Sequence, residues 1–166
     1  MGLFRRFGRT RYQSGKIYKI NMIYLGADHG GFSFKEKIKE FLKELKVEFE
    51  DLGNLKFEGE DDFVDYAAAV AKKVVETGER GILFCTSGLG MCIVANKIKG
   101  IRAVPVTSKK SAQQSREHLD ANILCLGEHV ISFRDAKKII KVWLETDFFN
   151  KDRYVRRLNK IKELEK

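Results

Sequence analysis

The sequence predicts a three-layer α/β/α sandwich around a five-stranded parallel sheet, with an extra helix at the C-terminus. Short apolar runs typical of buried strands alternate along the chain with longer segments of helical periodicity. The spacing between successive runs leaves room for one helix each time, which is typical of right-handed βαβ crossovers and a parallel sheet. The 166 residues suffice for one domain with a sizeable core.

The five predicted strands are apolar runs that end at turn signals. They span residues 22–27, 47–52, 81–85, 101–106 and 123–126. In a Rossmann-like sheet that carries helices on both faces, ligands bind at the carboxyl ends of the strands. We therefore expect the functional residues to follow the strands directly.

The predicted helices carry recognisable start and stop signals. Their start signals are, in chain order, Ser33 with Glu36, Asp62 or Asp65, the glycine-rich turn at 88–90, Ser108, and Ser132 with Asp135. These helices are expected to end near residues 45, 77, 98, 117 and 144. Gly78 supplies the stop signal of the second helix, and a last charged helix closes the chain.

The net charge of +9 is concentrated at the two ends of the chain. Residues 1–21 hold six basic and no acidic residues, residues 151–166 hold seven basic and three acidic ones, and the stretch between is nearly neutral. A nucleic-acid-binding face needs a basic patch on the folded surface, which this distribution does not predict. We expect residues 1–21 to be a disordered basic extension, added by an upstream start codon, and residues 22–166 to be the single domain.

The cysteine content and the hydropathy pattern bear on the compartment. Cys85, Cys92 and Cys125 cannot form a full set of disulfides and are expected to be reduced thiols in a cytoplasmic protein. No apolar run approaches the roughly 18 residues that span a membrane. The basic N-terminal stretch lacks the apolar core of a signal peptide. We therefore expect neither a membrane nor nucleic acid as a partner.

The strongest functional signal is Cys-Thr-Ser-Gly-Leu-Gly at 85–90, between a strand end and a helix start. The glycines let backbone N–H groups approach an anion, and a helix N-terminus favours both a bound anion and a thiolate. A base beside an anion cradle suits proton abstraction next to a carbonyl, where an enediolate must be held. From composition alone, a buried cysteine that closes a core strand explains Cys85 equally well.

Three common cofactor or phosphate loops do not fit the sequence. A cysteine phosphatase loop needs an arginine six positions after Cys85, where this chain has Met91. A nucleotide P-loop needs Gly-Lys-Ser/Thr, whereas Gly90 is followed by Met-Cys. The Gly-Ala-Asp-His-Gly-Gly run at 26–31 lacks the G-x-G-x-x-G spacing, so no nicotinamide cofactor is expected.

Three histidines and two arginines are further candidates, and each has a plain structural alternative. His29 could bind a ligand or simply lead into a helix, and His118 and His129 could act chemically or only complement a helix dipole. Arg153 and Arg157 are four apart on one helix face and could clamp a phosphate, although most such pairs only face solvent. The cysteines and histidines are too scattered to predict a metal site.

Several motifs match one family in order and spacing across residues 22–166. They are Gly-Ala-Asp-His-Gly-Gly at 26–31, Gly-Ile-Leu-Phe-Cys-Thr-Ser-Gly-Leu-Gly at 81–90, Ala-Asn-Lys at 95–97, Gly-Ile-Arg-Ala-Val at 100–104, Ser-Ala-Gln-Gln-Ser-Arg-Glu-His at 111–118, Ala-Asn at 121–122, and Arg153 with Arg157. By these motifs the chain resembles ribose-5-phosphate isomerase type B, a family that includes galactose-6-phosphate isomerase subunits. The resemblance implies interconversion of D-ribose 5-phosphate and D-ribulose 5-phosphate, as in the pentose phosphate pathway.

The resemblance assigns the chemistry to the loop after the third strand. It implies that Cys85 is the base that moves a proton between C1 and C2 of the sugar. The enediolate would be held by the Ser87 hydroxyl and by the backbone of its neighbours: Thr86, Gly88, Leu89 and Gly90. One subgroup of the family places a glutamate directly after this loop. Here that position is Met91, which indicates the cysteine type.

The resemblance also implies roles in substrate binding and assembly. His118 would be the acid that opens the furanose ring, Asp28 would contact sugar hydroxyls, and His29, Arg153 and Arg157 would bind the phosphate. Family members build each site from two subunits, with the histidine and the arginines reaching across. A homodimer or homotetramer with shared sites is therefore implied, and neither a cofactor nor a metal is expected.

The sequence departs from the family pattern at three of these positions. Leu119 stands where the family has asparagine, His129 where it has arginine, and Thr86 where it has glycine. Leu119 cannot make the polar contact, and losing such a contact can shift substrate preference by about 1–3 kcal/mol. Alternative substrates are therefore galactose 6-phosphate, allose 6-phosphate or a tetrose phosphate. The alternative from another class is a non-catalytic module that binds a phosphorylated ligand or RNA through the basic ends.

Overall fold

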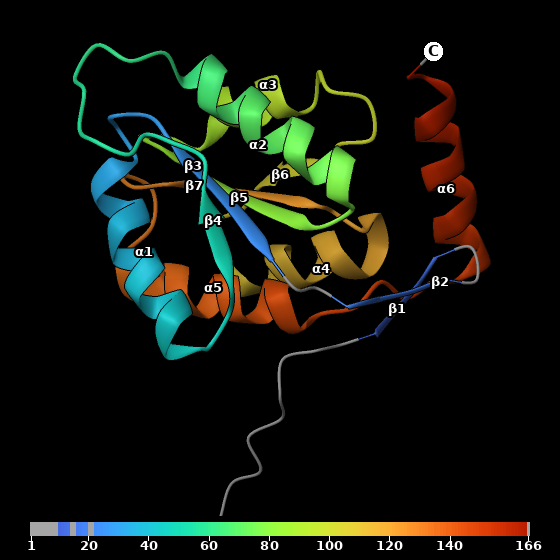
Figure 1. Ribbon diagram of the computed structural model, residues 1–166. Coiled ribbons are helices and arrows are strands. Elements are labelled where there is room, and N and C mark those ends of the chain that lie inside the picture. Colours follow the sequence, from blue (N-terminus) through green and yellow to red (C-terminus); the bar gives the residue numbers. More distant parts are fainter. Residues whose placement is uncertain (1–9, 14–15, 20–21, 166) are drawn as a thin grey trace, which may run out of the picture.

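The computed structural model describes residues 10–13, 16–19 and 22–165. Its centre is a five-stranded, all-parallel sheet in the order β4-β3-β5-β7-β6 (Figure 1). The strands are β3 (Ile23–Ala27), β4 (Phe49–Asp51), β5 (Arg80–Cys85), β6 (Ala103–Pro105) and β7 (Ile123–Gly127). The predicted five-stranded parallel sheet is confirmed.

Helices cover both faces of this sheet, which confirms the predicted three layers (Figure 1). One face carries α2 (Phe63–Thr77) and α3 (Leu89–Ala95). The other carries α1 (Phe32–Glu44), α4 (Lys109–Leu119) and α5 (Phe133–Glu145). The extra C-terminal helix, α6 (Asp152–Glu163), stands apart from the sheet beyond the amino ends of the strands (Figure 1).

Alternating side chains along the strands divide the core into two layers. In β5, Ile82 and Phe84 pack with α1 and α5, whereas Leu83 and Cys85 pack with α2 and α3. Cys85 is the last residue of β5. The fold therefore places its thiol at the carboxyl edge of the sheet, on the side of α2 and α3.

Most of the predicted helix signals are confirmed. The side chains of three predicted caps accept a backbone hydrogen bond from the first turn of their helix: Asp62, Ser108 and Ser132. Gly78 ends α2 in the left-handed conformation, with φ of 74°, which a glycine adopts without strain.

The predicted capping box at Ser33 is wrong. The helix begins one residue earlier, after Gly31, and has no side-chain cap. The carboxylate of Glu36 instead binds a lysine one turn further along the helix. A Cβ at position 31 would collide with the backbone of Phe84, so the close crossing of this turn over β5 decides where α1 starts.

Two short strands precede the sheet. The strands β1 (Thr10–Gln13) and β2 (Lys16–Lys19) form an antiparallel pair within the stretch 1–21, for which the sequence predicts disorder. Tyr12, Ile17 and Tyr18 are residue types that favour strands. The rest of that predicted extension lies outside the described residues, and a domain boundary at residue 22 stays a prediction. Among the residues described, no helix has the length and apolar character needed to cross a membrane.

Candidate active site

The loop after β5 lies at the carboxyl edge of the sheet. Thr86 and Ser87 are exposed, whereas Gly88 is buried and precedes α3 with φ of 79°. A Cβ at position 88 would lie 3.1 Å from the backbone nitrogen of Gly127, the last residue of β7. Glycine therefore lets the loop turn sharply while its backbone stays close to the neighbouring strand.

The thiol of Cys85 lies directly beneath this loop. Its side chain is almost buried, with 6% of the residue exposed. The backbone N–H of Gly88 donates a hydrogen bond to Cys85 Sγ at 3.0 Å, and the N–H of Leu89 donates one to Ser87 Oγ at 3.3 Å. An N–H donor and a helix N-terminus both stabilise negative charge on sulfur. The structure thus brings the predicted base and the predicted anion cradle together.

Asp28 and His29 follow β3 at the same edge. Asp28 is 7% exposed, and its buried Oδ1 has no hydrogen-bond partner within the described part of the chain. Burial raises the pKa of this carboxyl group, with a smaller contribution from the charge of Asp61. A buried acceptor without a partner is costly, so a ligand hydroxyl that reaches it gains a hydrogen bond that the protein leaves open.

His29 has a partner that the sequence does not reveal. Asp61 Oδ1 accepts a hydrogen bond from the backbone N–H of His29 at 3.0 Å and lies 2.6 Å from His29 Nδ1. The hydrogen bond to Asp61 is the main cause that raises the pKa of His29. Asp61 stands in an acidic loop without periodicity, and no sequence signal separates it from Glu58 or Glu60.

A fully buried lysine fixes the neighbouring loop. The ammonium of Lys35 lies 2.6 and 2.7 Å from the two carboxylate oxygens of Asp51. It also donates to the carbonyl oxygens of Gly53 at 3.1 Å and Asn54 at 2.7 Å. The side chain of Asn54 in turn donates to Asp61 Oδ2 at 2.7 Å. The backbone of this loop is therefore held from inside the protein.

The third element at this edge is the turn after β7. His129 is exposed, and its backbone N–H donates to the carbonyl oxygen of Thr86 at 3.1 Å. We call the group at this edge the carboxyl-edge cluster; it consists of Asp28, His29, Asp61, Cys85, Ser87 and His129.

Two further predicted site residues lie at the opposite edge. His118 and Leu119 end α4, which starts after β6 and runs back along the sheet for about 16 Å. Just beyond them, the carbonyl oxygen of Asn122 accepts a hydrogen bond at 2.9 Å from Gly81, near the start of β5. Within one chain, His118 is therefore separated from Cys85 by the length of the sheet.

The arginines of α6 join His118 at this far edge. The ring of His118 stacks on Tyr154 with a centroid distance of 4.6 Å and an interplanar angle of 15°. The guanidinium of Arg153 lies 4.6 Å from the centre of the same tyrosine ring. Arg157 is exposed one turn further on. We call His118, Leu119, Arg153, Tyr154 and Arg157 the α4–α6 cluster.

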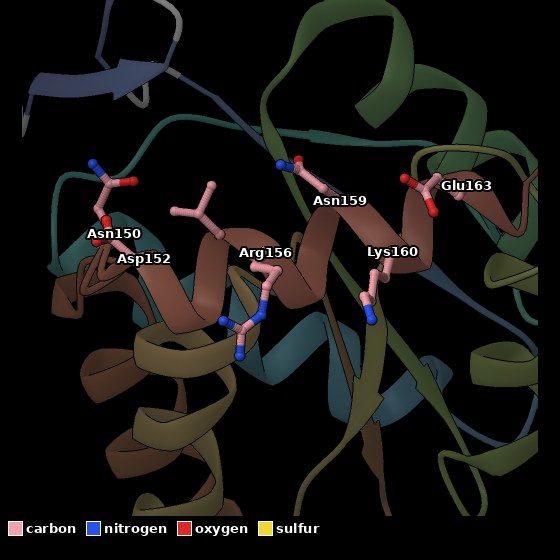
Figure 2. A pocket seen from close by; sticks show the side chains of 7 residues that line it. Asn150, Asp152, Arg156, Asn159, Lys160 and Glu163 are labelled. Carbon is pink, nitrogen blue, oxygen red and sulfur yellow. The ribbon is translucent and has the colours of Figure 1, made fainter.

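The outer face of α6 forms a separate shallow groove (Figure 2). It is lined by Asn150, Asp152, Val155, Arg156, Asn159, Lys160 and Glu163. Arg156 lines this groove, whereas Arg153 and Arg157 do not. The described residues contain no group of three His, Cys, Asp or Glu side chains that could hold a metal ion.

Comparison with known proteins decides the family. A family model described as Ribose/Galactose Isomerase matches residues 23–161. The chain belongs to this family. It is an enzyme, a sugar-phosphate isomerase of the intramolecular oxidoreductase class, and the resemblance seen in the sequence is confirmed.

Three similar proteins bear on fold and substrate. Ribose-5-phosphate isomerase B of Escherichia coli (strain K12) is 41% identical over 131 residues, which cover 78% of this chain and 87% of the relative. D-erythrulose-4-phosphate isomerase 2 of Mycolicibacterium smegmatis is 38% identical over 132 residues, covering 76% and 85%. The crystal structure of ribose-5-phosphate isomerase B from Mycoplasma genitalium with bound ribulose-5-phosphate matches with a TM-score of 0.83 and 38% identity, covering 87% and 95%. The Mycoplasma genitalium structure shares the fold, and the names of the relatives differ in the sugar.

Proposed function

We propose that this enzyme interconverts D-ribose 5-phosphate and D-ribulose 5-phosphate, with Cys85 as the base. The observation that carries the proposal is the 3.0 Å hydrogen bond from the Gly88 N–H to Cys85 Sγ, beside the unpaired carboxyl oxygen of Asp28. A base, an anion cradle and an acceptor for sugar hydroxyls meet there. The E. coli and Mycoplasma genitalium relatives, which are named for ribose 5-phosphate, support this choice of sugar.

The proposed reaction transfers one proton through the sulfur. The Cys85 thiolate takes the proton from C2 of the open-chain aldose, and the electron pair moves toward O1 to give an enediolate. The backbone of residues 86–90 and the Ser87 hydroxyl stabilise that charge. The proton on O2 passes to O1, and the thiol returns its proton to C1, which leaves a carbonyl group at C2. The reaction is internally balanced and needs no outside oxidant.

The α4–α6 cluster supplies the remaining groups from a second copy of the chain. In a homodimer, or a homotetramer of such dimers, His118 of one subunit faces Cys85 of the other and protonates the ring oxygen to open the furanose. Arg153 and Arg157 then bind the phosphate together with His29. The support for this arrangement is that a single chain separates His118 from Cys85 by the length of α4.

We also place the enzyme in the cytoplasm. The proposed base must stay a free thiol, and reducing compartments keep thiols free. Cys85, Cys92 and Cys125 are all unpaired in the structure, which fits this placement.

Leu119 favours a second candidate substrate. It is 41% exposed at the end of α4, directly after His118, where the family has asparagine. An apolar side chain there cannot hydrogen-bond a sugar hydroxyl, so a shorter or differently arranged sugar loses less. The M. smegmatis relative is named for a tetrose phosphate. A tetrose 4-phosphate or a hexose 6-phosphate is therefore the second candidate.

A phosphosugar panel with matched cysteine variants tests the proposal. Cys85→Ala is expected to lower turnover by about a hundred- to ten-thousand-fold, because it removes the group that moves the proton. Cys125→Ala is the control, since this thiol is buried in the neighbouring strand β7. If the enzyme turns over another phosphosugar but not ribose 5-phosphate, that sugar becomes the substrate in place of ribose 5-phosphate. Near-normal turnover of Cys85→Ala would remove Cys85 as the base.

A further inference from the structure

The carboxylate of Asp61 is unusually well enclosed for a residue in a surface loop. Its side chain is only 2% exposed. Oδ1 faces both the backbone N–H of His29 at 3.0 Å and the ring Nδ1 at 2.6 Å. Oδ2 accepts a hydrogen bond from Asn54 Nδ2 at 2.7 Å. Both oxygens of Asp61 are therefore committed to protein donors.

This contact determines what the imidazole of His29 can offer a ligand. With Asp61 ionised, Nδ1 carries a proton and donates it to Oδ1. The ring itself is 44% exposed, so Nε2 is the nitrogen that remains for a ligand. When the ring is charged, Nε2–H is a cationic donor.

We infer that Asp61 is a positioning residue that keeps His29 an imidazolium and directs its Nε2–H toward the phosphate of the substrate. The inference rests on the proposed function, in which His29 binds that phosphate. An imidazolium donor gives a phosphate dianion a charge-assisted hydrogen bond, which is stronger than the bond from a neutral ring.

The two carboxyl groups that face His29, those of Asp28 and Asp61, are not equally suited to serve as its counter-charge. Burial raises the pKa of Asp28, which weakens its hold on a negative charge. Burial also opposes ionisation of Asp61, but the hydrogen bonds from His29 and Asn54 prevail and lower its pKa. The hydrogen bond to Asp61 is the largest cause that raises the pKa of His29, and the charge of Asp28 adds a smaller one. Asp61 is therefore the stable counter-charge.

An acidic residue near a phosphate site would ordinarily repel the ligand. Asp61 avoids this because its carboxylate lies behind the imidazole, with its oxygens occupied by three donors. When the ring is charged, the pair with His29 is neutral as a whole and presents its positive end to solvent. This arrangement fixes the orientation of the His29 ring and keeps the negative charge of Asp61 away from the ligand.

The enclosed network under the β4–α2 loop holds Asp61 in place. Asn54 is buried, and its carbonyl oxygen accepts a hydrogen bond from Lys35 Nζ at 2.7 Å. Its side-chain oxygen accepts one from the backbone of Lys56 at 3.1 Å. The donor that fixes Asp61 Oδ2 is thus itself fixed, so the imidazole orientation does not depend on a mobile side chain.

The direct test is a titration of His29 by NMR in the free enzyme, with His29→Asn used to assign the signal. In the wild-type enzyme, the neutral form of the His29 ring is expected to carry its proton on Nδ1. In Asp61→Asn the pKa of His29 is expected to fall, because the ring loses its hydrogen-bonded counter-charge. Glu60→Gln, the neighbouring exposed acid, is the control and should leave the pKa unchanged.

Kinetics separate positioning from a merely structural role. The relevant pH range lies between the pKa of His29 in Asp61→Asn and its pKa in the wild type. In that range we expect the KM of the variant for the phosphosugar to rise about tenfold, while its kcat stays within about twofold of the wild-type value. At lower pH, where the variant imidazole is again charged, KM should return to the wild-type value. A rise in KM that is equal at every pH would overturn the inference.

The outcomes distinguish this inference from the proposed function. An unchanged His29 titration in Asp61→Asn contradicts the role of Asp61, whatever the enzyme turns over. A normal KM in His29→Asn contradicts the phosphate assignment on which the inference rests. If Asp61→Asn does not fold, the wild-type enzyme still tests the inference. A neutral His29 ring that carries its proton on Nε2 would contradict the hydrogen bond from Nδ1 to Asp61 and overturn the inference.

Discussion

The carboxyl-edge cluster and the α4–α6 cluster are built in different ways. The first is assembled by the sheet: Cys85 ends a buried strand, and Lys35 holds the adjoining loop from inside the core. The second is assembled by two helix ends that meet through one stacked pair, His118 on Tyr154. Arg153 lies against the same tyrosine ring, and Arg157 is exposed one turn further on.

This difference fits the separate roles that the proposed function gives the two clusters, proton transfer at the carboxyl edge and phosphate binding by the α4–α6 cluster. The reaction requires the base and the anion cradle to keep a fixed geometry, and the packed edge of a sheet provides that. Phosphate binding also requires positive charge, and exposed arginines provide that. The carboxyl-edge cluster lies within one chain, whereas in the proposed function the α4–α6 cluster serves the active site of a second copy.

The largest expected effect is on protein stability, through the lysine that holds the loop beside the carboxyl-edge cluster. Lys35→Met leaves two carbonyl oxygens and Asp51 without their buried donor, so the free energy of unfolding should fall by about 3 kcal/mol. Lys39→Met is the control: Lys39 also contacts Asp51 but is partly exposed, so its loss should cost less than about 1 kcal/mol. Urea unfolding measures both. Equal losses would mean that the carboxyl edge is not held by Lys35.

The next largest effect concerns substrate binding. Replacing both Arg153 and Arg157 with Met is expected to raise the KM about ten- to hundredfold through lost charge-assisted hydrogen bonds. Thermal stability should change little, because both residues are largely exposed and the main loss is the contact of Arg153 with the Tyr154 ring. Arg156→Met removes one positive charge from the groove on α6 that Arg153 and Arg157 do not line (Figure 2) and should leave KM unchanged. A similar KM for the double variant and for Arg156→Met would contradict the assignment of the phosphate to Arg153 and Arg157.

The smallest effect concerns the choice of sugar. Leu119→Asn restores the polar group that the family carries after the histidine, and it should favour ribose 5-phosphate over a tetrose phosphate by about threefold to tenfold in the ratio of kcat/KM values. Competition assays with both sugars measure the ratio. An unchanged ratio would show that this end of α4 does not contact the sugar.

The fold and the carboxyl-edge loop were largely predictable from the sequence. Buried parallel strands are continuous apolar runs, and the strand that ends at Cys85 is one of them. Caps such as Asp62 and Ser108 are local signals, so they could be read without tertiary information. The failure at Ser33 has a tertiary cause, because the crossing of Gly31 over β5 sets the helix start.

The contacts that position His29 could not be predicted. Asp61 is 32 residues away from His29, and Lys35 is 16 residues away from Asp51. Both pairings depend on how the β4–α2 loop packs, for which no periodicity or motif exists. The place of His118 follows from the direction of α4 once the strand order is known. Which residue His118 faces in the proposed shared site depends on how two copies of the chain pack, for which the sequence carries no local signal.

Mixing two inactive variants tests the shared site most directly. Cys85→Ala and His118→Asn are each expected to be nearly inactive alone. When the two chains are co-expressed, a mixed dimer holds one site with both native residues, so activity should recover to about a quarter of the wild-type value. If activity stays at the level of the unmixed variants while mixed dimers are present, Cys85 and His118 do not meet across subunits.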